Sequence, residues 1–181
     1  WFPWTIEAVR LLDRAGFLLC VTTNQSGIAL GFCRDAFVRR AHEEMSAAID
    51  AAGARIDGWF YCPHHPQAAI DALRTDCECR KPKPGLVRQA QERFDIDLSR
   101  SFVIGDKAAD VGLAEAVGSR GILVRTGYGE SELVRHSGHD RSRHALVGRS
   151  DQGSQGFFHG SKGHLLATNL GEVMVMFFGV V

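Results

Sequence analysis

The chain of 181 residues lacks any apolar run that approaches the roughly 20 residues needed to span a bilayer. It also lacks net charge: acidic and basic residues number 21 each, so no excess charge favours nucleic acid or an anionic membrane. The start, Trp1-Phe2-Pro3-Trp4, lacks the basic and apolar regions of a secretory signal. We therefore expect a cytoplasmic protein with no membrane or nucleic-acid partner.

Cysteine is scarce, with five residues, yet three of them lie in two close groups that read C-x-H and C-x-C. Three thiols and one imidazole are the ligand set of a closed, structural zinc site. Clustered thiols without a secretory signal favour metal binding over disulfides. We expect Zn²⁺ to be bound by Cys62, His64, Cys77 and Cys79, with His65 as the alternative to His64, and we interpret Cys20 and Cys33 as plain thiols.

Apolar runs and amphipathic segments alternate along the first 127 residues. The predicted strands are residues 17–23, 58–61, 101–104 and 121–125, and the predicted helices are residues 5–15, 35–52, 84–94 and 107–117. This alternation predicts an α/β fold, a Rossmann-like parallel sheet with helices on both faces. The length suits one domain with a sizeable core.

The character of the sequence changes after about Arg135. Residues 148–163 are rich in Gly, Ser and Gln, and the three histidines of residues 136–144 have no regular ligand spacing. We therefore expect a domain at residues 1–134, with the zinc-binding loop as an insert, and an irregular tail at residues 135–181. Near the end, residues 173–178 are apolar but too short to cross a bilayer.

Polar side chains follow the ends of two predicted strands and the second cysteine pair. Thr23 offers a hydroxyl, Arg80 and Lys81 offer cations, and Asp106 offers a carboxylate, with Asp110 one helical turn further on. In parallel sheets, reactive groups gather beyond the carboxyl ends of the strands. A hydroxyl, free backbone amides, cations and a carboxylate suited to Mg²⁺ together predict a phosphate-binding site.

This combination resembles the haloacid-dehalogenase-like phosphatases, and within them the zinc-containing D-glycero-D-manno-heptose 1,7-bisphosphate 7-phosphatases. Four motifs within residues 2–127 carry the resemblance: Thr23-Asn24-Gln25-Ser26-Gly27-Ile28, Cys62-Pro63-His64-His65-Pro66, Cys77-Glu78-Cys79-Arg80-Lys81-Pro82 and Ile104-Gly105-Asp106-Lys107. In that family the enzyme removes the 7-phosphate of a heptose bisphosphate and supplies heptose for bacterial surface polysaccharide.

The resemblance implies a role for each site residue. Thr23 and Asn24 contact the transferred phosphoryl group, and Lys81 neutralises its charge. Arg80 reads the rest of the sugar phosphate, and Lys107 lies beside the site. Asp106 binds Mg²⁺ with the support of Asp110. The implied substrate is a small sugar phosphate, and we expect a monomer.

The family's mechanism also needs an aspartate nucleophile and a second aspartate two residues later, in a D-x-D motif at the end of the first strand. That strand would precede Trp1, so we expect this chain to be incomplete and inactive. Leu11-Leu12-Asp13-Arg14-Ala15-Gly16 echoes such a motif, but Asp13 falls within a helical period. In the family the first strand lies between the strands that end at Thr23 and Asp106. Its loss would leave two strand edges unpaired. One hypothesis is that residues 173–178 fill the vacant position.

Three alternatives stay open at this point. Histidinol-phosphate phosphatases share both cysteine motifs, although the longer gap between Cys62 and Cys77 favours the heptose branch. A non-catalytic, zinc-stapled sugar-phosphate-binding protein fits a chain without its nucleophile. A zinc-ribbon nucleic-acid module is disfavoured by the neutral charge and by the lack of an aromatic and basic surface pattern around the cysteines.

Overall fold

The computed structural model describes residues 4–135, 144–147 and 173–176. In this part of the chain the elements follow the order α1 (Thr5–Arg14), β1 (Leu18–Asn24), α2 (Ser26–Ala29), α3 (Asp35–Ala51), β2 (Gly58–Cys62), η1 (Asp71–Leu73), α4 (Gly85–Arg93), η2 (Leu98–Arg100), β3 (Phe102–Gly105), α5 (Ala108–Val117), β4 (Arg120–Val124), α6 (Gly129–Arg135), β5 (His144–Val147) and β6 (Val173–Met176). The eight elements predicted before residue 127 are all present, with ends within about two residues of those predicted.

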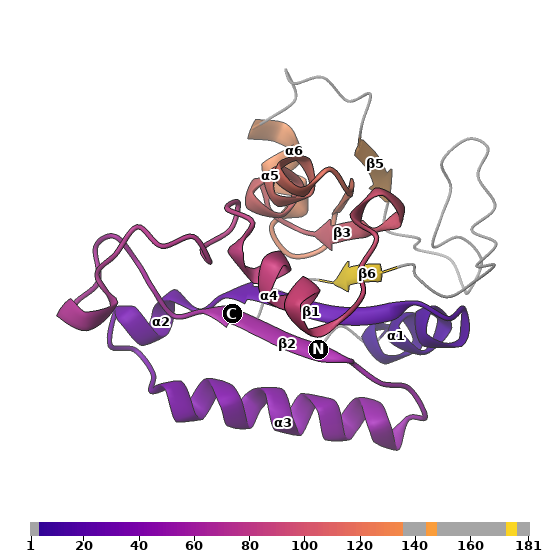
Figure 1. Cartoon of the computed structure of the whole chain (residues 1–181), viewed down its shortest axis with the longest axis horizontal. Coiled ribbons are helices and arrows are strands. Elements are labelled where there is room, and N and C mark those ends of the chain that lie inside the picture. Colours follow the sequence, from indigo (N-terminus) through magenta and orange to yellow (C-terminus); the bar gives the residue numbers. More distant parts are fainter. Residues whose placement is uncertain (1–3, 136–143, 148–172, 177–181) are drawn as a thin grey trace.

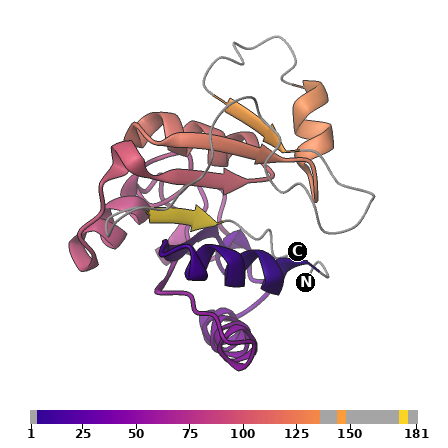
Figure 2. The same cartoon turned by 90° about the vertical axis from the view of Figure 1, so that its right-hand side faces the viewer.

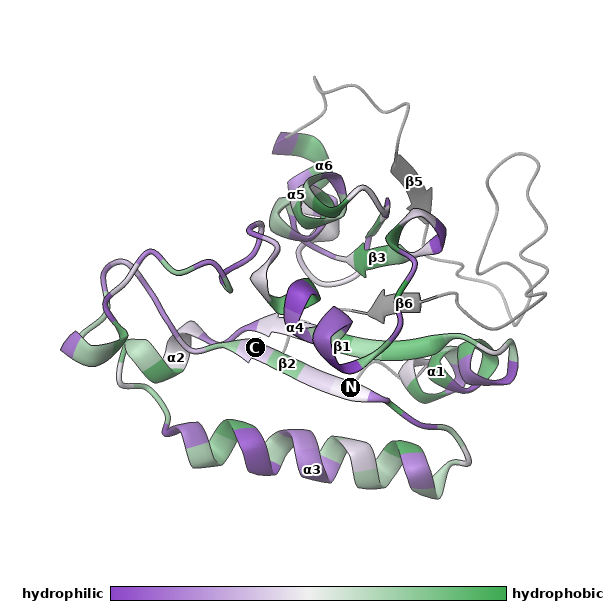
Figure 3. Ribbon diagram, viewed as in Figure 1, coloured by the Kyte–Doolittle hydropathy of each residue, from purple (hydrophilic) through white to green (hydrophobic). Residues whose placement is uncertain are grey.

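The six strands form one parallel sheet in the order β2-β1-β6-β3-β4-β5 (Figure 1). Five of the seven residues of β1 are buried, which suits a strand covered on both faces. Figure 3 shows that the ribbon of β1 is mostly hydrophobic and that hydrophobic and hydrophilic residues alternate along α3. The fold predicted from the alternation is confirmed.

Two apolar clusters cover the two faces of the sheet. On one face α4 and α5 pack on β1 and β3 through a cluster that includes Cys20, Val87, Val103 and Leu113. On the other face α1 and α3 pack on β1 through Val9, Leu19 and Ile49, with Phe102 and Ile104 of β3 against them. The fold therefore has three layers, helices, sheet and helices. Because all the strands are parallel, their carboxyl ends lie at one edge of the sheet.

The segment that we predicted to be an irregular tail contains two of the six strands. β5 extends the sheet beside β4, and β6 lies between β1 and β3, as Figures 1 and 2 show. The hypothesis that the C-terminal apolar run fills the central position is therefore confirmed for residues 173–176. Phe177, Phe178 and the Gly- and Ser-rich residues 148–163 lie outside the described residues.

None of the described helices combines the length and the apolar character needed to cross a bilayer.

Candidate functional site

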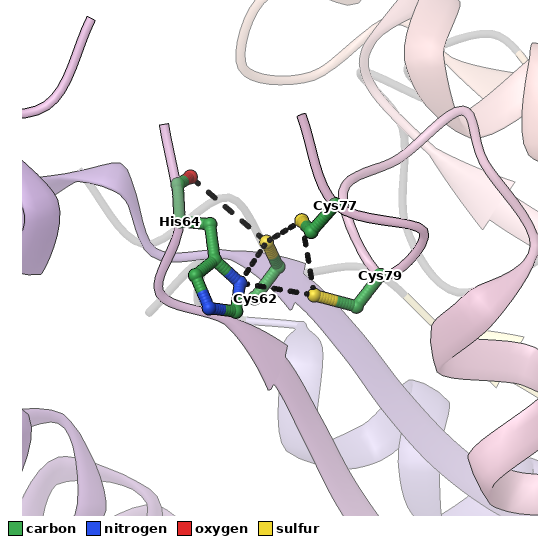
Figure 4. Close-up of side chains that lie close together, drawn as sticks. All are labelled: Cys62, His64, Cys77 and Cys79. Atoms are coloured by element: carbon green, nitrogen blue, oxygen red, sulfur yellow. Dashed lines mark hydrogen bonds between the residues drawn. The ribbon is translucent and has the colours of Figure 1, made fainter. Parts of the chain in front are cut away.

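The C-x-H and C-x-C motifs converge just beyond the carboxyl end of β2. The ligand atoms of Cys62, His64, Cys77 and Cys79 all lie within 4.8 Å of one another (Figure 4). Adjacent contacts range from 3.2 Å, between the sulfurs of Cys77 and Cys79, to 3.8 Å, between Cys62 Sγ and His64 Nδ1. Ligands of a tetrahedral Zn²⁺ with bonds of about 2.3 Å lie about 3.5–3.8 Å apart, so this donor set fits zinc.

The surroundings of the thiols also fit a metal site. Burial raises the pKa of the Cys62 thiol well above its ordinary value, so the uncharged thiol is favoured without a cation. A bound metal reverses this preference because it binds the thiolate. His65 is not part of the cluster: its Nδ1 accepts a hydrogen bond from the backbone N–H of Gln67 at 3.1 Å. The alternative of His65 as ligand is therefore wrong.

The two remaining cysteines lie elsewhere. Cys20 is buried in β1, and burial raises the pKa of its thiol to about 12. Cys33 is half-buried before α3. Neither belongs to a cluster of metal-ligating groups among the described residues.

The cysteine loop positions Arg80 directly. The Arg80 guanidinium donates hydrogen bonds to Ser26 Oγ at 2.7 Å and to the backbone carbonyl of His64 at 3.2 Å. The first partner starts α2, beyond the carboxyl end of β1, and the second is a predicted zinc ligand. The guanidinium therefore joins the cysteine-containing loop to the end of β1.

Lys81 lies at the centre of the site. Its ammonium group donates to the backbone carbonyl of Thr22 in β1 at 2.9 Å and forms an ion pair with Asp110 in α5 at 2.7 Å. Because Thr22 and Asp110 belong to elements on opposite sides of β6, Lys81 bridges the two halves of the sheet. The side chains of Lys81 and Asp110 are both almost fully buried. Burial lowers the pKa of Lys81 to about 8 and raises that of Asp110, and each ion opposes the shift of the other.

The end of β1 contributes the side chains of Thr23 and Asn24 to the site. Thr23 Oγ1 accepts a hydrogen bond from the side-chain amide of Gln25 at 3.2 Å. The amide of Asn24 pairs with both backbone groups of Lys81, accepting from its N–H at 3.0 Å and donating to its carbonyl at 3.2 Å. Asn24 therefore holds the backbone of Lys81 beside the end of β1, a contact that the motif did not reveal.

The two acidic residues have different surroundings. Asp110 Oδ1 faces Lys81, and its Oδ2 accepts from the backbone N–H of Lys107 at 3.1 Å. Asp106 Oδ2 accepts from the backbone N–H of Tyr128 at 2.9 Å, and no hydrogen bond from a described residue reaches its Oδ1. Asp106 is thus the carboxylate with an oxygen left for a cation. Asp110 orients Lys81 and the start of α5.

A glycine-rich turn after β4, Gly127-Tyr128-Gly129, was missed by the sequence reasoning. Gly127 has φ +60°, and a Cβ atom there would lie 2.2 Å from Asp106 Oδ2. The Lys107 ammonium lies 4.4 Å from the centre of the Tyr128 ring, a cation–π contact. The signal that could have revealed this turn is a pair of glycines directly after a buried strand.

We expect Gly127→Ala to weaken Mg²⁺ binding at Asp106 and to destabilise the fold by about 1–3 kcal/mol, because the left-handed backbone and the close approach both exclude a side chain. Urea unfolding measures the stability change, and calorimetric titration with Mg²⁺ measures binding. Gly53→Ala is the matched control, since Gly53 also has positive φ, +74°, but a Cβ atom there would meet no other atom within 4 Å. Equal Mg²⁺ affinities of the two variants would contradict this role of the turn.

The structure places two D-x-D-like stretches away from the site. Asp13 lies within α1, and its carboxylate is 3.8 Å from the Arg55 guanidinium. A true D-x-D, Asp95-Ile96-Asp97, precedes β3 and so lies at the opposite edge of the sheet. The Asp97 carboxylate accepts from the backbone N–H of Ser99 at the start of η2. Neither stretch can supply a nucleophile to the site.

Residues 78–148 match the family described as HAD-hydrolase-like. The D-glycero-beta-D-manno-heptose-1,7-bisphosphate 7-phosphatase of Rhodopseudomonas palustris is 43% identical over 121 residues, which is 67% of each chain. The protein of the same name from Escherichia coli is 43% identical over 124 residues, which is 67% of this chain and 64% of that protein. The chain thus spans about two thirds of the length of these relatives.

Two solved structures show the same fold. The D,D-heptose 1,7-bisphosphate phosphatase from B. bronchiseptica, complexed with magnesium and phosphate, superposes with a TM-score of 0.69 at 32% identity, covering 80% of this chain and 76% of that one. The phosphatase of the same name from Burkholderia thailandensis gives a TM-score of 0.59 at 30% identity, covering 80% and 77%. The resemblance read from the motifs is confirmed, and the chain belongs to the heptose 1,7-bisphosphate phosphatase family of the haloacid-dehalogenase-like hydrolases.

Proposed function

We propose that this chain forms the phosphate-binding body of a phosphoric monoester hydrolase that removes the 7-phosphate of D-glycero-D-manno-heptose 1,7-bisphosphate. The observation that carries the proposal is the position of Lys81, a buried cation held between the end of β1 and Asp110. A buried ammonium group at the point where two strands end suits a phosphoryl group whose charge must be neutralised.

Each residue of the site has a proposed role. Lys81 neutralises the phosphoryl oxygens, and the Thr23 hydroxyl and the backbone beyond it bind them. Asn24 adds to this by holding the Lys81 backbone. Arg80, anchored on Ser26 and on the zinc-binding loop, contacts the remainder of the sugar phosphate. Lys107 lies beside the site, where it contacts Tyr128.

Two metals are proposed. Cys62, His64, Cys77 and Cys79 would hold a structural Zn²⁺, because three sulfurs and one imidazole nitrogen leave no position open for a substrate. Asp106 would hold Mg²⁺, with Asp110 supporting the site through Lys81 and Lys107. When bound, Mg²⁺ neutralises phosphate charge. The solved relative from B. bronchiseptica contains magnesium and phosphate.

The nucleophile is the part that the described strands do not supply. In the family it is an aspartate, and the reaction passes through an aspartyl phosphate that divides one displacement into two. The strand that lies between β1 and β3 is β6, whose residues Val173-Met174-Val175-Met176 include no carboxylate. We propose that these 181 residues bind the sugar phosphate without hydrolysing it.

We further propose that the protein is cytoplasmic and monomeric.

We expect no release of phosphate from heptose 1,7-bisphosphate above background when the 181-residue chain is assayed with Mg²⁺. A version with a D-x-D strand added ahead of Trp1 should hydrolyse this substrate and should prefer it to histidinol phosphate. Phosphate release at fixed enzyme concentration measures both. Turnover by the 181-residue chain would refute the proposal that it lacks a nucleophile. A preference for histidinol phosphate would assign the chain to the histidinol-phosphate phosphatases instead.

A further inference from the structure

The start of α6 contacts three consecutive residues at the start of α5. Tyr128 directly precedes α6; its backbone N–H donates to Asp106 Oδ2 at 2.9 Å, and its ring lies 4.4 Å from the Lys107 ammonium. One helical turn further on, Glu132 Oε2 accepts from the backbone N–H of Ala108 at 2.9 Å. The turn between β4 and α6 therefore holds the segment that carries the proposed Mg²⁺ ligand and the cation beside it.

The backbone of Tyr128 is fixed by contacts that do not involve its ring. Its carbonyl accepts hydrogen bonds from the backbone N–H of Glu132 at 3.0 Å and from Ser131 Oγ at 2.7 Å. The next residue, Gly129, packs so closely against the carbonyl of Val124 that no side chain fits there. The conformation of this turn is therefore determined by the backbone, and a change of the side chain at position 128 should leave it in place.

The ring of Tyr128 contributes little to the core. The residue is 51% exposed. Among the described residues, its ring contacts the Lys107 ammonium and its hydroxyl has no hydrogen-bond partner. A half-exposed ring buries little apolar surface and so adds little to stability. The face of an aromatic ring does, however, attract a cation, and Lys107 supplies one.

Lys107 is connected to the phosphate site through Asp110. The backbone N–H of Lys107 donates to Asp110 Oδ2 at 3.1 Å, while the other oxygen of that carboxylate pairs with Lys81 at 2.7 Å. Burial lowers the pKa of Lys81, the charges of Asp110 and Asp106 raise it, and the positive charge of Lys107 lowers it again. The two lysines thus repel each other across the site, and an anion that contacts both would reduce this repulsion.

A lysine that must bind an anion gains from being held in place beforehand. The side chain of an exposed lysine is flexible, and ordering it when a ligand binds costs conformational entropy. A ring that already holds the ammonium removes part of this cost. The ammonium has three N–H donors, so those that do not point at the ring can still reach a phosphate oxygen. The contact with Tyr128 and a contact with phosphate are therefore compatible.

We propose that Tyr128 is a positioning residue of the phosphate site, whose ring holds the Lys107 ammonium beside Asp106 in readiness for a phosphoryl oxygen. This role rests on the proposed function, because it requires an anion that Lys107 contacts. It belongs to the ring and not to the hydroxyl, so phenylalanine at position 128 should preserve it and an aliphatic side chain should lose it. The backbone hydrogen bond from position 128 to Asp106 should remain in both cases.

The first measurement uses the full chain without any ligand. An aromatic ring shields protons that lie over its face, so the ε-methylene protons of Lys107 should resonate upfield of the ordinary lysine position in the NMR spectrum of the native chain. Lys107→Met identifies the resonance by its absence. The upfield shift should persist in Tyr128→Phe and disappear in Tyr128→Leu. Phe37→Leu, which removes a 65% exposed ring from α3, is the matched control and should leave the shift unchanged.

The second measurement is calorimetric titration with heptose 1,7-bisphosphate in the presence of Mg²⁺. Tyr128→Leu should lower the affinity about two- to fivefold, the range that an exposed cation–π contact contributes, whereas Tyr128→Phe and Phe37→Leu should bind as the native chain does. In the Lys107→Met background, Tyr128→Leu should cause no further loss, because the cation that the ring holds is gone. Titration with Mg²⁺ alone should give the same affinity for Tyr128→Leu as for the native chain, since Asp106 keeps its backbone hydrogen bond.

An unshifted Lys107 resonance in the native chain would overturn the proposal without recourse to any variant of Tyr128. A loss of bisphosphate affinity that persists without Lys107, or an equal loss of Mg²⁺ affinity, would also overturn it, because Tyr128 would then act through the turn. Native binding that Tyr128→Leu leaves unchanged would refute the role of Tyr128 alone. A native chain that shows the shifted resonance but does not bind the bisphosphate would instead refute the proposed function, and with it this role of the ring.

Discussion

Lys81→Met is expected to weaken binding of heptose 1,7-bisphosphate to the chain roughly 10- to 100-fold, because hydrogen bonds to a charged group contribute about 1.5–3 kcal/mol. The ammonium group of Lys81 is the cation that joins Thr22 of β1 to Asp110 of α5. Methionine has a similar length but neither charge nor donors. Calorimetric titration of the bisphosphate in the presence of Mg²⁺ measures the change.

Lys83→Met is the matched control. Lys83 stands two residues away, but its ammonium pairs with the exposed carboxylates of Asp76 and Glu78 at 2.9 and 3.6 Å. Exposed ion pairs contribute little, so this variant should bind as the native chain does. Equal affinities of the Lys81 and Lys83 variants would remove Lys81 from the phosphate site.

A second variant separates binding from folding. Lys81→Met alone leaves Asp110 as a buried, unpaired carboxylate, which costs about 3–5 kcal/mol in comparable cases. Lys81→Met with Asp110→Asn removes that charge and should recover part of the lost stability in urea unfolding, while ligand affinity stays low. Recovery of affinity together with stability would show that Lys81 acts only through the fold.

The sequence predicted which polar residues lie at the strand ends because the pattern that indicates a buried strand is contained in a few neighbouring residues. Buried strands such as Phe17 to Thr23 read as continuous apolar runs, and the polar residues after them must lie at one edge of a parallel sheet. The grouping of Cys62, His64, Cys77 and Cys79 was predicted for the same reason, since C-x-H and C-x-C already place the donors in pairs. Both inferences depend on neighbours in the sequence.

The contacts that the sequence did not reveal join distant segments. The amide of Asn24 pairs with the Lys81 backbone across 57 positions, and the Tyr128 N–H binds Asp106 across 22 positions. The place of β6 was predicted only as a hypothesis, because the apolar run of residues 173–178 does not by itself say which strands it will pair with. The edges of β1 and β3, which are far away in the sequence, determine its place.

Cys79→Ser, a change in the cluster of Cys62, His64, Cys77 and Cys79, should abolish zinc binding and lower the melting temperature of the protein. Cys79 lies 3.2 Å from the Cys77 sulfur and 3.3 Å from His64 Nδ1, so its loss opens a site that four protein ligands close. Loss of a structural metal is among the largest single-residue effects, here about 3 kcal/mol or more. For a chain of this length this lowers the melting temperature by roughly 6–12 °C.

The same variant should also weaken phosphosugar binding, because the loop that loses its metal positions the two cations of the site. Arg80 follows Cys79 directly and donates to the carbonyl of His64. Metal analysis, thermal unfolding and calorimetric titration measure the three effects, and addition of a chelator to the native chain should reproduce them.

Cys33→Ser is the control, since Cys33 lies outside the cluster and its substitution should leave zinc content, melting temperature and affinity unchanged. If the native chain contains no zinc after purification in its presence, or if Cys79→Ser binds the bisphosphate normally, the cluster does not organise Arg80 and Lys81. The phosphate site would then depend on other contacts, which among the described residues include those of Lys81 with Thr22, Asn24 and Asp110.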